Sequence, residues 1–127
     1  MDKNKYFDKP KATYVTRGVA EKIPMSVQML VWCVIEEAKT KVEQMDYLQV
    51  FNIKCNTSEQ RLEIKHSQEA PDFFEEVMYM PFDTEIDEKI YVIDDIDHIT
   101  MLLASEYWRN FKKQDTFVIT LMDCMEY

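Results

Sequence analysis

Two short stretches hold both histidines of the chain, together with residues whose types could do chemistry. In the first, His66-Ser67-Gln68-Glu69, an imidazole next to a hydroxyl resembles a base beside a nucleophile. The preceding residues alternate, however, so that Leu62 and Ile64 share one strand face with His66. Adjacent residues on a strand point to opposite faces, and His66 therefore cannot activate Ser67. We predict that His66 lies on the apolar face and has a structural role.

The second stretch, Asp94-Asp95-Ile96-Asp97-His98, combines carboxylates with an imidazole. Such groups can bind a divalent metal ion, and a metal ion could support hydrolysis. A calcium loop would continue with a glycine and a distant bidentate glutamate, and the chain has neither in place. An acid-rich, solvated turn is therefore favoured, and no metal or other cofactor is predicted. A metal-assisted hydrolase built on Asp94, Asp95, Asp97 and His98 is kept as an alternative function.

These stretches must be positioned by a scaffold that reads mostly as strands. We predict strands over residues 13–16, 47–54, 61–68, 74–80, 89–94, 98–103 and 116–121, a helix over residues 25–41 and a short helix over residues 105–111. The predicted fold class is α+β, with one long helix packed on a largely antiparallel β-sheet. It forms a single domain over residues 12–127 after a flexible N-terminal stretch over residues 1–11.

The predicted long helix begins after Pro24, a residue that favours the first turn of a helix. Its centre, residues 29–35, is apolar on every side. Such a helix is normally covered on both sides, by the sheet on one and by other chain or a partner on the other. A structural protein that covers this helix by forming a homo-oligomer is therefore a further alternative.

Composition excludes several classes of protein. The single glycine, Gly18, leaves no glycine-rich phosphate loop, dinucleotide fingerprint or nucleophile elbow. Cys33, Cys55 and Cys124 are odd in number and widely spaced, which indicates neither a disulfide framework nor a zinc site. No apolar run approaches the ~20 residues of a membrane span, and no signal-peptide core follows the charged N-terminus. A cytoplasmic location is predicted.

The charge distribution points to a class of partner. The net charge is −9, and residues 69–97 contain eleven acids and one base. Such a surface repels phosphate backbones and anionic membranes and attracts basic protein surfaces. We therefore predict a protein partner, with no direct binding of nucleic acid or membrane. The predicted partner-binding residues are Glu75, Glu76, Asp83, Glu85, Asp87, Glu88, Asp94, Asp95 and Asp97.

Four segments, residues 14–21, 46–51, 66–69 and 92–103, resemble a family of small uncharacterised proteins catalogued as domain of unknown function 960. The family occurs in staphylococci, other Firmicutes and their mobile elements, and the resemblance covers about residues 12–107. It implies no activity, cofactor or catalytic residue. This chain has Ile96 where the resemblance leads us to expect glycine in the acidic turn.

The resemblance adds a biological context. Small acidic proteins of phages and mobile elements often inhibit host nucleic-acid machinery, including restriction and CRISPR effectors, whose channels are basic. The leading hypothesis is therefore a non-enzymatic, acidic protein-binding module. In its narrower form, this module is a nucleic-acid mimic or anti-CRISPR-like inhibitor that engages the basic nucleic-acid-binding surface of a host-defence protein.

Overall fold

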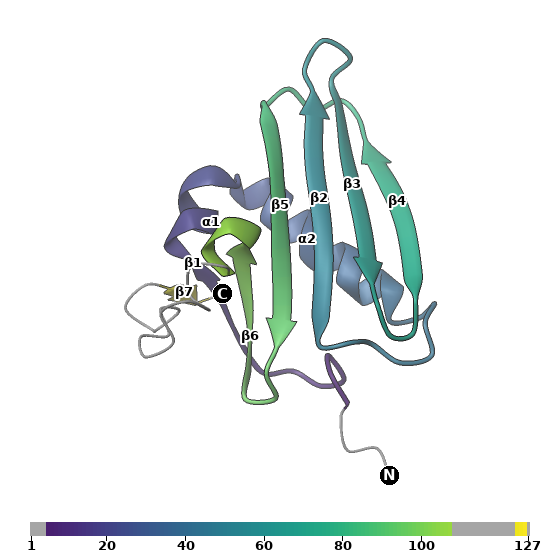
Figure 1. Ribbon diagram of the computed structural model, residues 1–127. Helices are drawn as coiled ribbons and strands as arrows, with labels where there is room; N and C mark the ends of the chain where they lie inside the picture. Colours follow the sequence, from purple (N-terminus) through teal and green to yellow (C-terminus); the bar gives the residue numbers. More distant parts are fainter. Residues whose placement is uncertain (1–4, 108–123, 127) are drawn as a thin grey trace.

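A computed structural model of the protein describes residues 5–107 and the backbone of residues 124–126 (Figure 1). In this part of the chain, seven strands form one sheet in the order β4-β3-β2-β5-β6-β1-β7. All neighbouring strands are antiparallel except β1 and β6, which run parallel. The strands are β1 (Ala12–Thr16), β2 (Leu48–Asn56), β3 (Arg61–Gln68), β4 (Phe73–Tyr79), β5 (Ile86–Asp94), β6 (His98–Leu103) and β7 (Cys124–Glu126).

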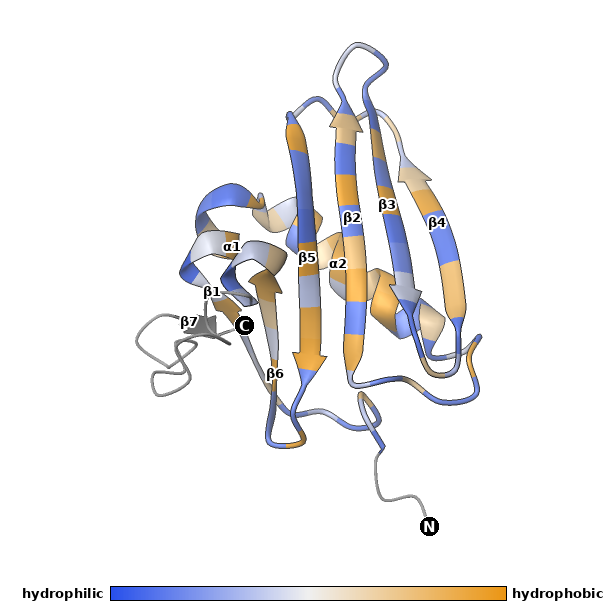
Figure 2. Ribbon diagram, viewed as in Figure 1, coloured by the Kyte–Doolittle hydropathy of each residue, from blue (hydrophilic) through white to orange (hydrophobic). Residues whose placement is uncertain are grey.

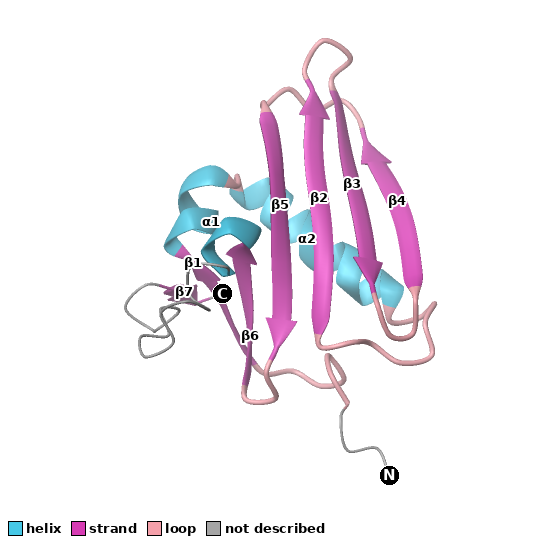
Figure 3. Ribbon diagram, viewed as in Figure 1, coloured by secondary structure: helices cyan, strands magenta, loops and turns pink. Residues whose placement is uncertain are grey.

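The predicted fold class, α+β with one long helix on a largely antiparallel sheet, is wrong. The described part of the chain is mostly a mixed sheet, and its helices are short: α1 (Arg17–Lys22) and α2 (Met25–Ala38). Figure 3 shows how strands dominate the molecule. Residues 104–107 form one further helical turn, where the short helix over residues 105–111 was expected to start. The predicted strand over residues 116–121 lies outside the described residues.

Helix α2 ends three residues earlier than predicted because the chain turns after Ala38. The amide of Lys41 donates to the Ala38 carbonyl over 2.8 Å, and the Thr40 hydroxyl donates to the Glu37 carbonyl over 2.7 Å. A hydroxyl that competes for backbone carbonyls favours a turn over continued helix. The predicted start after Pro24 is confirmed.

Helix α1 was not predicted from the sequence. Thr16 caps it, because its hydroxyl accepts a hydrogen bond from the Val19 amide. The Glu106 carboxylate accepts from the amides of Gly18, over 3.1 Å, and Leu103, over 2.9 Å. A Cβ atom on residue 18 would overlap with this carboxylate, so the single glycine of the chain provides space for a close approach.

The alternation of side chains along the strands explains the two faces of the sheet (Figure 2). On β2 and β3, every second residue is buried, including Phe51, Ile53, Leu62 and Ile64. These residues form one hydrophobic cluster with the buried side of α2. The other face of β2 to β5 carries exposed polar residues, and we call it the open face.

Helix α2 is only partly covered. Its core side is buried, whereas Met29 is 50% exposed and Cys33 is exposed. The sequence pattern predicts that α2 is covered on both sides, but the described residues cover only its core side.

The predicted flexible stretch over residues 1–11 is in part a component of the domain. Phe7 is 3% exposed and belongs to the hydrophobic cluster. The ring of Tyr6 packs against that of Tyr47, with 6.0 Å between the centroids. Residues 6 and 7 are therefore anchored by contacts that lie more than forty positions away in the sequence.

Candidate partner-binding surface

The structure divides the predicted acidic surface between the two ends of the sheet. Asp83 and Glu85 lie in the loop from β4 to β5, whereas Asp95 and Asp97 lie in the turn from β5 to β6. Figure 1 shows this loop and this turn at opposite ends of β5. The nine residues of β5 separate them by roughly 25 Å, since a strand rises about 3.3 Å per residue. One continuous acidic patch over residues 75–97 therefore does not form.

One group of acids stays together at the end of the sheet where β4 leads into β5. We call it the acidic loop: Asp83 and Glu85 of the connection from β4 to β5, and Asp87 and Glu88 at the start of β5. None of its carboxylates forms an ion pair within the described residues. The first three side chains are exposed and the fourth is half-buried. The acidic loop is thus a group of carboxylates without ion-pair partners in the described part of the chain, beside Lys54, which lies opposite Asp87 in the strand register.

The acids at this end of the sheet affect the pKa of the Cys55 thiol. Burial raises its pKa, and the negative charges of Asp83 and Glu85 raise it further. The thiol points toward the same loop, because its sulfur lies 3.5 Å from the carbonyl oxygen of Phe82. A raised pKa keeps the thiol protonated, so Cys55 is not a nucleophile at neutral pH.

Strand β4 carries exposed apolar side chains along its length, and Met78 and Met80 lie at the same end of the sheet as the acidic loop. Phe74 is 61% exposed and Met78 is 55% exposed, and both share the open face of β4 with Glu76. Met80, which follows the strand, is 63% exposed. Within the described residues β4 pairs only with β3, so its outer edge is free. Apolar side chains, a carboxylate and an unpaired backbone edge therefore occur on one strand.

Glu75, a predicted partner-binding residue, points to the covered side of the sheet instead. Its carboxylate pairs with the Lys41 ammonium over 2.8 Å and lies 3.5 Å from Nδ1 of His66. The side chain of Glu75 is 13% exposed. It joins the loop after α2 to the sheet, and this contact assigns it a structural role.

Asp94, also a predicted partner-binding residue, is 1% exposed. Its carboxylate pairs with the Lys11 ammonium over 2.9 Å and accepts from the amides of Phe7, over 2.6 Å, and Ile96, over 2.7 Å. The carboxylate thus has three partners, two of which belong to the N-terminal segment. Asp94 fastens the N-terminal segment to the sheet and takes no part in an exposed surface.

The acidic turn also lacks the convergence that a metal site needs. The Asp95 carboxylate accepts from the amides of Asp97 and His98, and it lies 3.3 Å from Nε2 of His98. Asp94 points inward to Lys11. In the described part of the chain, no three histidine, cysteine or acidic side chains are placed to hold a metal ion. The hydrolase alternative therefore has no assembled site there.

Ile96 adopts a backbone conformation that favours glycine, with φ at 83°. The expectation from the family resemblance, a glycine at this point, thus has a physical reason, because a β-branched residue is strained there. Ile96 is 52% exposed and loses little burial on replacement.

We expect Ile96→Gly to raise the free energy of unfolding by about 1 kcal/mol, the order of the penalty for a left-handed conformation. Ile96→Ala keeps the unfavourable conformation and should gain less than half of this. Urea unfolding of the three proteins checks the prediction. A glycine variant less stable than the wild type would show that the side chain of Ile96 contributes more than its strain costs.

His66 occupies the apolar face, as predicted, and Ser67 points to the other. The imidazole is fully buried and stacks on Phe51 with 4.5 Å between the ring centroids. Its Nε2 lies 2.6 Å from Oε1 of Gln49. The amide nitrogen of Gln49 donates to the Asp46 carbonyl and to Oε1 of Gln68, each over 2.8 Å. His66 is thus part of a satisfied, buried polar network.

This network defines which nitrogen of the neutral imidazole carries the proton. Because both protons of the Gln49 amide are donated elsewhere, its oxygen accepts and Nε2 of His66 must donate. In the neutral ring, Nδ1 is then an acceptor facing Glu75. Burial lowers the pKa of His66, and the carboxylate of Glu75 opposes that shift in part. The neutral imidazole is therefore favoured in the folded protein.

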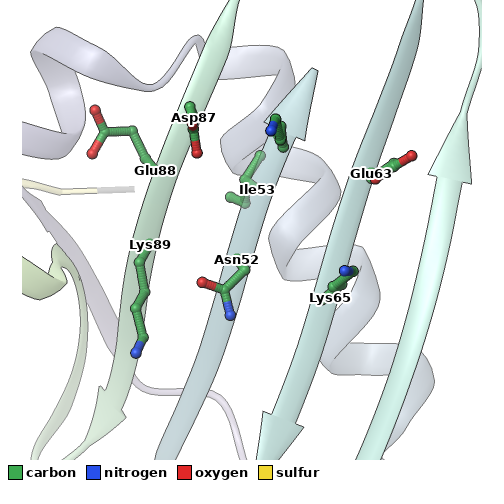
Figure 4. A pocket seen from close by; sticks show the side chains of 8 residues that line it. Asn52, Ile53, Glu63, Lys65, Asp87, Glu88 and Lys89 are labelled. Atoms are coloured by element: carbon green, nitrogen blue, oxygen red, sulfur yellow. The ribbon is translucent and has the colours of Figure 1, made fainter. Parts of the chain in front are cut away.

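The open face contains a shallow depression of about 180 Å³ between β2, β3 and β5 (Figure 4). Its lining residues are Asn52, Ile53, Lys54, Glu63, Lys65, Asp87, Glu88 and Lys89. The strand register places Lys54 opposite both Glu63 and Asp87. Lysines and acids thus alternate across the strands, with no hydroxyl or thiol among them for a base to activate. This depression has the character of a solvated sheet surface.

Comparison with known proteins identifies the family of this chain. Residues 12–106 match the family described as staphylococcal protein of unknown function, DUF960. The chain belongs to this family. The resemblance inferred from the sequence is confirmed. The chain is also similar in fold to the crystal structure of a protein of unknown function from Enterococcus faecalis. The TM-score is 0.69 at 22% sequence identity, and the match covers 82% of this chain and 97% of that one. No curated protein matches the chain.

The described part of the DUF960 chain contains no helix with the length and hydropathy that crossing a membrane requires. The partner-binding residues predicted from the sequence do not include the exposed apolar residues of β4. A signal was available, since Phe73, Phe74, Val77 and Met78 make β4 apolar on both faces. A strand that is apolar on both faces is normally covered on both.

Proposed function

We propose that this DUF960 protein is a non-enzymatic protein-binding module that engages a basic protein surface. The observation that supports it is the combination, at one end of the sheet, of the exposed Met78 and Met80 with the acidic loop, whose carboxylates have no ion-pair partner within the described residues. Apolar residues with methionine among them supply the core of protein interfaces. Carboxylates around such a core steer a basic partner and reject acidic ones.

The narrower role expected from the sequence is inhibition of a host-defence protein through its nucleic-acid-binding surface. It stays a prediction, and the sign of the charge is what supports it. A basic channel that holds nucleic acid attracts carboxylates for the same reason that it attracts phosphates. Nucleic acid in excess should then displace the protein from such a partner.

Affinity capture from host lysate with matched charge variants tests the proposal. The test variant combines Asp83→Asn, Glu85→Gln and Asp87→Asn. The control combines Glu69→Gln, Asp72→Asn and Asp97→Asn, which removes the same charge from the opposite end of the sheet. Stability should stay within about 0.5 kcal/mol of wild type in both, because these side chains are exposed.

We expect the test variant to capture its partner at least tenfold less than wild type at physiological salt, and the control to capture it normally. The loss should appear mainly in the association rate and should diminish at high salt. Equal capture by both variants would show that the acidic loop is only a solvated surface. The proposed function would then be wrong.

A further inference from the structure

We propose that the free edge of β4 binds an extended, basic segment of the partner as an additional strand of the sheet. This inference rests on the proposed function and specifies how the partner is held. Addition of a strand supplies affinity through backbone hydrogen bonds and specificity through alternate side chains. The outer edge of β4 presents the backbone groups that such a ladder requires.

Of the features that usually protect a free sheet edge, β4 has only the charges of Glu75 and Glu76, one on each face. Proteins block such edges with lysine, proline, bulges or very short strands. Strand β4 has seven residues and contains neither lysine nor proline. Its pairing with β3 runs without a break from Phe73 opposite Gln68 to Tyr79 opposite Leu62, so no bulge distorts it. A regular edge of this length, without lysine, proline or a bulge, is suited to binding a strand.

The side chains of β4 define the sequence pattern of the partner. On the open face, Glu76 lies between Phe74 and Met78. Residues directly opposite each other in a sheet share a face, so the added strand needs a basic residue between two apolar ones on this side. The acidic loop, which follows β4, favours a further basic residue at that end of the added strand.

A second copy of the chain fits the edge less well. In an antiparallel pair of identical strands, opposite residues must share a face, which restricts the possible registers. The register in which the two strands overlap fully places Glu76 opposite its own copy. Like charges directly opposite each other destabilise a sheet. A basic partner strand avoids this repulsion.

The probe is a synthetic peptide, Lys-Thr-Val-Thr-Lys-Thr-Val-Thr-Lys, whose valines and lysines share one face of a strand. Two versions carry N-methyl groups, one on the amides of the odd residues and one on those of the even residues. Because backbone groups alternate between the two edges of a strand, only one version should lose the ladder. We expect that version to bind at least tenfold more weakly in fluorescence anisotropy, and the other to bind like the parent peptide.

Charge reversal tests the register. Glu76→Lys should weaken binding of the parent peptide at least tenfold, and a peptide with glutamate as its central residue should restore it. Asp97→Lys makes the same change of charge in the distant turn and should leave binding within threefold of wild type. Circular dichroism verifies that both variants are folded.

Three outcomes overturn strand addition. Equal binding of both N-methylated peptides would mean that charge alone holds the peptide, and absence of binding would mean that the edge takes no strand. A dimer in light scattering that the peptide leaves intact would assign the edge to a second copy. In each case, capture of the partner that still depends on the acidic loop would leave the proposed function standing. Failure of strand addition is therefore distinguishable from failure of the proposed function.

Discussion

Asp94→Ala is expected to lower the free energy of unfolding by about 3–5 kcal/mol, the usual cost of breaking a buried ion pair from one side. The carboxylate is 1% exposed and pairs with Lys11, whose side chain is 8% exposed. Removing it leaves the ammonium buried without its counter-ion. The amides of Phe7 and Ile96 lose their acceptor at the same time. The N-terminal segment should then detach from the sheet.

The double variant Lys11→Met/Asp94→Leu separates these contributions. It removes both charges together, so it should be more stable than Asp94→Ala. Asp97→Ala is the control, because this nearby carboxylate is exposed, and it should stay within about 0.5 kcal/mol of wild type. Urea unfolding measures all three. A loss below about 1 kcal/mol for Asp94→Ala would show that the ion pair contributes little to folding.

The protein should also lose stability as the pH falls below about 6.5, the ordinary pKa of histidine. Burial lowers the pKa of His66 in the folded state. The unfolded chain therefore binds a proton that the folded chain rejects. The stability is fully present above pH 6.5 and decreases as the pH falls toward the lowered pKa. For one proton, the decrease approaches ~1.4 kcal/mol per pH unit.

Urea unfolding at pH 7.5, 6.5 and 5.5 measures this dependence. His66→Gln retains a donor for Gln49 but does not titrate, so its stability should change less with pH than that of the wild type. His98→Gln is the matched control, because this imidazole belongs to the first residue of β6 and lies outside the buried network. The interpretation fails if His66→Gln and wild type lose stability in parallel.

The local features of the fold follow from the sequence. The strands over residues 61–68 and 98–103 have their predicted bounds. Over residues 61–68, buried and more exposed residues alternate at a period of two, which is a local property of the sequence. The same alternation predicts that His66 points inward. The start of α2 after Pro24 depends only on the fixed geometry of proline. Family membership likewise comes from short segments of sequence.

The tertiary structure alone decides which acids share a surface. Residues 69–97 form one run in the sequence, but β4 and β5 carry its members to opposite ends and both faces of the sheet. Asp94 is buried because Lys11, far away in the sequence, reaches it, and Glu75 is occupied because Lys41 does. The free edge of β4 depends on strand order, which no local pattern encodes. Charge is a property of composition, whereas its availability to a partner is set by long-range contacts.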